Sequence, residues 1–118
     1  MFEKTTAEES ELRGYLLGIR RQDDSPQDAR DHLEELEQLV DTMGIPVTGS
    51  EMAVVARPSP AYLVGTGKVD AVKASAEMGD ANLVIVDDDL TPAQQRNWEK
   101  RTELAVIDRR EVILDIFA

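Results

Sequence analysis

The amino-acid sequence predicts an α/β fold of three layers, in which a mainly parallel four-stranded sheet carries helices on both faces. Short apolar runs typical of strands alternate with segments that have the apolar spacing of amphipathic helices. A chain of 118 residues is long enough for one domain with one core. The run LVIVD, residues 83–87, is the clearest strand, and its apolar character predicts a place in the interior of the sheet.

The first strand is expected at 12–19, where the run LRGYLLGI is largely apolar. A helix follows, because Ser25 is a favoured N-cap residue and Pro26 is favoured at the first helical position. Apolar side chains then recur at the three- and four-residue spacing of one helix face: Ala29, Leu33, Leu36, Val40 and Met43. Gly44 is expected to end this helix as a C-cap residue.

The second strand is expected within 45–56, which Gly49 interrupts, so that one bent strand or two short strands fit the pattern. A second helix is expected over 68–78, with Gly79 at its end. These two elements are joined by a segment rich in proline and glycine, which predicts a connection outside the sheet.

A third helix is expected from Pro92 to about Arg101. Thr91 is a favoured N-cap residue, and Gln94 stands three residues later, as a capping box requires. The apolar run at 105–108 is the fourth predicted strand. The order of strands and helices then favours a parallel sheet with right-handed crossovers.

Three segments are expected along the chain: an acidic flexible N-terminus at 1–10, an α/β domain at 11–110, and the start of a helix at 111–118. The last segment has large apolar residues at helical spacing and runs to Ala118 without a capping signal: Val112, Ile113, Ile116 and Phe117. We therefore expect the chain to be a piece of a longer protein, cut within or just before a helix.

The composition excludes several classes of function. Cysteine is absent, which excludes disulfides, thiolate metal sites and cysteine nucleophiles. No apolar run is long enough to cross a membrane, and we expect a cytoplasmic protein. With 13 basic and 24 acidic residues the formal net charge is −11, which argues against direct DNA binding.

The segment GTGK, residues 65–68, is the motif most suggestive of phosphate binding. A P-loop is excluded, because Tyr62 stands where the first glycine is required and Val69 where a serine or threonine is required. A dinucleotide fingerprint is excluded because Asp70 stands at the third glycine position. Two interpretations stay open: a tight turn before a helix, or a nucleotide or anion site at the helix N-terminus. The residues concerned are Gly65, Thr66, Gly67 and Lys68.

The turn interpretation makes two structural predictions. Gly65 or Gly67 should have a positive φ, or lie so close to another backbone that a Cβ would clash. Lys68 should be exposed or paired with a nearby carboxylate, and should not bind a triphosphate.

The acidic run at 87–89 follows the third strand, at the edge where open α/β sheets place ligands. Three carboxylates suit magnesium, but neighbouring residues on a strand point to opposite sides, which favours an acidic loop and no metal site. His32 is the only histidine and is expected to be solvated, while Trp98 is expected to pack. No serine has a visible base partner, so we assign no catalytic residue.

Three stretches together resemble the N-terminal domain of HflX-type GTPases: YLVGTGKVDAV, LVIVDDDLTPAQQRNWEK and AVIDRREVILDIFA. The resemblance is weak before residue 45 and strong after 61. Trp98 departs from the leucine that is usual in the family, and Arg110-Glu111 departs from a pair that contains threonine.

The resemblance implies a regulatory and ribosome-binding domain of a ribosome-associated GTPase. GTP and magnesium would bind a separate G domain, and this chain would hold no cofactor. The implied partners are the large ribosomal subunit, the protein's own G domain and a helical hairpin. Alternatives are an autonomous ATP-binding domain and a purely structural scaffold. We predict partner or interdomain contacts at Asp87, Asp88, Asp89, Arg96, Asp108 and Arg109.

Overall fold

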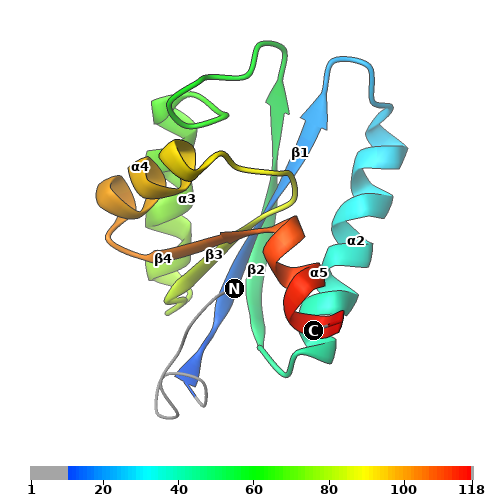
Figure 1. The fold of residues 1–118 in the computed structure, drawn as a ribbon, viewed down its shortest axis with the longest axis vertical. Helices are drawn as coiled ribbons and strands as arrows, with labels where there is room; N and C mark the ends of the chain where they lie inside the picture. Colours follow the sequence, from blue (N-terminus) through cyan, green and yellow to red (C-terminus); the bar gives the residue numbers. More distant parts are fainter. Residues whose placement is uncertain (1–10, 118) are drawn as a thin grey trace.

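A computed structural model describes residues 11–117, in which strands and helices alternate as predicted (Figure 1). The strands are β1 (Gly14–Arg21), β2 (Val47–Val55), β3 (Leu83–Val86) and β4 (Ala105–Asp108). The helices are α2 (Pro26–Thr42), α3 (Thr66–Met78), α4 (Pro92–Thr102) and α5 (Arg109–Phe117).

The four strands form one sheet in the order β2-β1-β3-β4, and all three neighbouring pairs are parallel. The α/β fold class is therefore confirmed, as is the interior place of 83–86. Leu17 of β1 lies between Glu51 of β2 and Val86 of β3. Strand β2 is continuous through Gly49, with a register shift against β1 between Gly14 and Tyr15.

Helices cover both faces of the sheet (Figure 1). Helices α2 and α5 pack on one face, over a core that includes Leu16, Leu36 and Ile85. Helices α3 and α4 pack on the other face, over a core that includes Val72 and Trp98. Alternate side chains of β1 and β3 enter the two cores, so both strands are buried on both faces.

Local capping signals set the starts of two helices as predicted. The Ser25 hydroxyl accepts a hydrogen bond from the Asp28 amide at 3.0 Å. Thr91 and Gln94 form a complete capping box at the start of α4. Helix α2 ends at Thr42 with Met43 as its C-cap, so the predicted C-cap Gly44 follows one residue later, with a φ of 80°.

One expectation about the helices needs correction, and one helix is only partly buried. Helix α3 begins at Thr66, two residues before the predicted start, because Gly65 in extended conformation serves as its N-cap. In α5 the predicted apolar stripe is only partly buried: Val112 is fully buried, but Ile113 and Phe117 are 38% and 78% exposed. The short α5 packs on α2 along one side only.

The predicted acidic flexible segment at 1–10 lies outside the described residues, as does Ala118. Within residues 11–117, no helix is both long and apolar enough to cross a bilayer.

The two-sided burial of β1 predicts a large cost for truncating its side chains. Leu17 is completely buried, so Leu17→Ala should lower the free energy of unfolding by about 2–5 kcal/mol. Met78→Ala is the matched control, because Met78 is 92% exposed and its loss should cost less than about 0.5 kcal/mol. Urea unfolding measures both, and equal losses would contradict the assigned core.

Candidate functional site

The GTGK segment forms the first turn of α3 and its N-cap. Gly65 has φ −72° and ψ 155°, and its carbonyl accepts hydrogen bonds from the amides of Lys68 and Val69 at 3.1 and 3.2 Å. No side chain caps this helix start. Residues 65–68 therefore belong to the start of the helix itself, and they form no long loop that could surround a phosphate.

The prediction that Gly65 or Gly67 has a positive φ or a close backbone neighbour is wrong. Gly65 has a negative φ, Gly67 lies in the helix, and a Cβ added to either would meet no heavy atom within 4 Å. The left-handed residue of this connection is Leu63, with a φ of 68° and a buried side chain. An N-cap residue is extended and a helical residue has negative φ, so the chain reverses upstream of the glycines.

The reversal takes place in a closed loop from Ser59 to Leu63. The two residues exchange backbone hydrogen bonds of 3.0 and 2.8 Å. The Ser59 hydroxyl also accepts from the amides of Ala61 and Tyr62, each at 3.2 Å. This loop follows β2 at the carboxyl edge of the sheet and delivers the chain to α3.

Helix α4 holds the loop by three side chains that donate to its carbonyl oxygens. Gln94 donates to Ser59 at 2.8 Å, Asn97 to Ala61 at 3.0 Å, and Trp98 to Tyr62 at 2.8 Å. Trp98 is also completely buried, which confirms its packing role. Gln94 and Asn97, two polar residues of the stretch TPAQQRNW, thus serve the fold.

Lys68 points back to the sheet and pairs with Glu51 of β2. Its ammonium group donates to Glu51 Oε2 at 2.8 Å, and the Tyr15 hydroxyl donates to Oε1 at 2.7 Å. Burial alone would raise the pKa of Glu51, but these hydrogen bonds outweigh it and lower that pKa. The turn interpretation expected Lys68 to be exposed or paired with a carboxylate, and it is paired with Glu51, which nothing in the sequence pattern singled out.

The topological switch point of the sheet lies between β1 and β3. After β1 the chain passes to the face of α2, and after β3 it passes to the opposite face of α4. Open α/β sheets bind ligands at this point, outside the carboxyl ends of the strands. Here Arg21, the last residue of β1, reaches across it and binds Asp88 through two nitrogens, each at 2.9 Å. Sequence reasoning missed Arg21.

The three aspartates after β3 do not converge on one point. Asp87 is buried and lies 3.3 Å from Arg109, which also pairs with Glu35 of α2 at 3.2 Å. Asp88 binds Arg21 and accepts from the amide of Asp89, whose own side chain is exposed. Across residues 11–117, no group of three His, Asp or Glu side chains is arranged to hold a metal ion.

Asp108 connects β4, α5 and the loop after β3. One carboxylate oxygen accepts from the amide of Glu111 at 2.9 Å and the other from the amide of Leu90 at 2.8 Å. Arg96 lies apart from this group, exposed on α4. The structure therefore brings Asp87, Asp88, Asp108 and Arg109 to one edge of the sheet. It leaves Arg96 and residues 65–68 outside that group.

Comparison with known proteins identifies the family of this domain. A family described as GTP-binding GTPase N-terminal matches residues 30–118. The chain belongs to this family. It is 38% identical over 118 residues to the GTPase HflX of Akkermansia muciniphila, covering all of this chain and 27% of that protein.

Other relatives give the same result. The GTPase HflX of Escherichia coli K12 is 42% identical over 90 residues, which are 73% of this chain and 20% of that protein. The predicted resemblance to the N-terminal domain of HflX-type GTPases is thereby confirmed. The chain spans about a quarter of the length of these relatives.

Solved structures support the fold. A mutation variant of SsGBP superposes with a TM-score of 0.65 at 19% identity, over 90% of this chain and 32% of that one. A GTP-binding protein from the archaeon Sulfolobus solfataricus in complex with GDP gives a TM-score of 0.62 at 19% identity, over 91% and 30%.

Asp87 gives the folding stability a pH dependence of predictable sign. Burial raises the pKa of Asp87 from 3.8 to about 6, against the opposing effect of Arg109. The folded protein holds this proton more tightly than the unfolded chain. The resulting stabilisation is present in full below about pH 3.8 and is lost as the pH rises through about 6. As the pH rises across that window, deprotonation of Asp87 should lower the free energy of unfolding by about 2 kcal/mol.

Urea unfolding between about pH 4 and pH 7 measures this effect. Asp87→Asn should remove this part of the pH slope, since asparagine does not titrate. Asp89→Asn is the matched control, because Asp89 is exposed and its variant should keep the slope. Identical slopes in the parent and Asp87→Asn proteins would show that Asp87 keeps an ordinary pKa.

Proposed function

We propose that this chain is the regulatory and ribosome-binding N-terminal domain of an HflX-type GTPase that acts on the large ribosomal subunit in the cytoplasm. A G domain outside this chain binds GTP with magnesium and hydrolyses the GTP. The domain's partners are then the ribosomal subunit, the G domain and a helical hairpin between them. Family membership supports the GTPase part of this proposal.

One observation supports the proposal that nucleotide binding belongs to the G domain and not to this domain. The edge of the sheet that would receive a nucleotide is closed by the chain's own ion pairs, Arg21 with Asp88 and Arg109 with Asp87. Lys68, the one lysine in a glycine-rich setting, is engaged by Glu51. A sheet edge at which Arg21, Lys68 and Arg109 are already paired with carboxylates suits contact with other proteins or domains better than it suits phosphate binding.

The GTPase proposal gives α5 a connecting role. Arg109 is the first residue of α5 and is anchored to both Asp87 and Glu35. Three large side chains of this helix remain exposed: Ile113, Leu114 and Phe117. A following domain would cover such an apolar surface, and the anchored start of α5 would fix the orientation of that domain.

Deleting residues 1–118 from the protein that carries them tests the proposal directly. The full-length protein should co-sediment with isolated large ribosomal subunits in the presence of a non-hydrolysable GTP analogue. The truncated protein should still hydrolyse GTP at its basal rate but should lose subunit binding and stimulation by the subunit. Unchanged co-sedimentation after the deletion would overturn the ribosome-binding role and leave the scaffold and ATP-binding alternatives.

Nucleotide titration of residues 1–118 tests the alternative of an autonomous ATP site. We expect neither micromolar affinity for ATP or GTP with magnesium nor any GTP hydrolysis, because no loop surrounds a phosphate. Lys68→Ala should not alter any residual affinity, and calorimetry measures both proteins. Micromolar binding that Lys68→Ala abolishes would establish a nucleotide site at residues 65–68.

A further inference from the structure

Strand β2 is an open edge of the sheet. It pairs with β1 along Val47–Val55, and no other strand among residues 11–117 pairs with its second side. Nine residues in extended conformation present an edge about 30 Å long. An unpaired edge offers a row of backbone donors and acceptors to which another extended chain can add.

The side chains of β2 leave this edge accessible on the side of α2. Ala53 and Val55 enter the core on the opposite face, so Ser50 and Val54 point to the α2 side. Ser50 is exposed and Val54 is 70% exposed. Glu51 is the one charged residue of the strand, but it faces the other way and is held by Lys68 and Tyr15.

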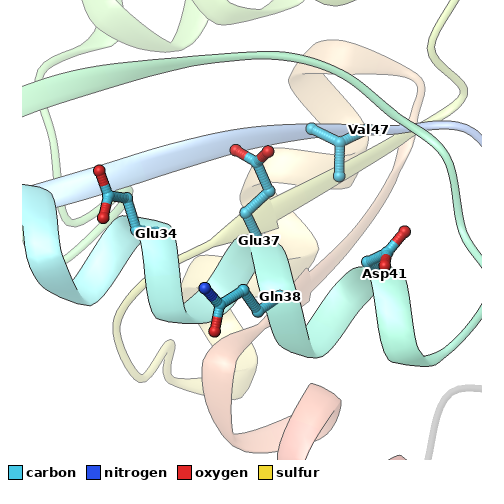
Figure 2. Close-up of a pocket in the computed structure, with 5 residues that line it drawn as sticks. All are labelled: Glu34, Glu37, Gln38, Asp41 and Val47. Atoms are coloured by element: carbon cyan, nitrogen blue, oxygen red, sulfur yellow. The ribbon is translucent and has the colours of Figure 1, made fainter.

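An acidic groove of about 550 Å³ lies between α2 and Val47, the first residue of this strand. Figure 2 shows its lining, with the Glu37 carboxylate pointing from α2 toward the strands beside Val47. Glu34, Glu37 and Asp41 stand three and four residues apart, which places them along one side of the helix. No cation among residues 11–117 forms an ion pair with these three carboxylates.

The chemistry of the groove selects among possible occupants. The three carboxylates do not meet at one point, so a metal ion does not fit. They repel the phosphates of a nucleic acid. They also repel acidic strands, and a strand without basic side chains leaves them uncompensated, which limits edge-to-edge pairing between copies of this domain. A strand with basic side chains satisfies both the open backbone edge and the carboxylates.

We propose that the β2 edge docks an extended, lysine- or arginine-rich segment of a partner protein as a fifth strand. Backbone hydrogen bonds to β2 supply the alignment. Alternate basic side chains of the segment face α2 and pair with Glu34, Glu37 and Asp41. This docking requires neither nucleotide nor ribosome, so it stands or falls separately from the function proposed above.

A synthetic peptide of about eight residues, alternating lysine and threonine, is the probe. It should bind the full chain, and hydrogen exchange followed by NMR should show newly protected amides within Val47–Val55. A peptide of the same length that alternates glutamate and threonine should not bind. Absence of binding by the basic peptide, or binding without new protection in β2, would overturn the proposal.

Two triple variants distinguish ion pairs formed in the groove from a general effect of the net charge on peptide binding. Glu34→Gln, Glu37→Gln and Asp41→Asn together should weaken peptide binding about tenfold, which corresponds to three ion pairs of ordinary strength. The matched control changes the net charge equally at exposed sites elsewhere: Asp23→Asn, Glu77→Gln and Asp89→Asn. The control should bind within about twofold of the parent protein. Equal weakening by both triples would show that only the net charge attracts the peptide.

A single substitution on the strand gives an independent test. Ser50→Lys adds a cation on the α2 side of the edge and should reduce peptide binding about tenfold, while Ser50→Thr should bind like the parent protein. Ser50 is exposed, so neither change should unfold the domain. Undiminished binding by Ser50→Lys would exclude this edge as the docking site.

Discussion

The structure depends on the burial of β1 and β3 on both of their faces. Each of these strands sends alternate side chains into two separate cores, such as Leu16 and Leu17 in β1. Such strands are stable only when helices cover the sheet on both sides. The chain meets this requirement by placing α2 and α5 on one face and α3 and α4 on the other (Figure 1).

The same arrangement creates the switch point between β1 and β3. At that point, ion pairs hold the elements of the domain together. Arg21 of β1 holds Asp88 after β3, and Arg109 joins Asp87 to Glu35 of α2. These contacts link both central strands with helices α2 and α5. An edge that serves as a binding cleft in many α/β proteins is therefore occupied here by ion pairs between the domain's own elements.

The stretch that most strongly resembles HflX-type proteins has a structural explanation. Gln94, Asn97 and Trp98 donate hydrogen bonds to three carbonyl oxygens of the loop at 59–63 and so fix that loop against α4 where the chain leaves β2. Tryptophan in place of the usual leucine fills the core and adds an indole N–H donor. A family signature of this kind identifies a fold and does not by itself identify a catalytic site.

The sequence by itself determined the order of the elements, the starts of α2 and α4, and the absence of a P-loop. These properties rest on residues that are close in the chain, such as the caps Ser25 and Thr91, and on the period of apolar residues. Tertiary structure alone decided the strand order, the partners of Lys68 and Asp88, and the burial of Asp87. Those features join segments separated by 17 to 67 residues, and the paths of the crossovers determine which segments meet. The glycines at 65 and 67 show the limit of local reasoning, because the chain reversal that they suggested is made upstream at Leu63.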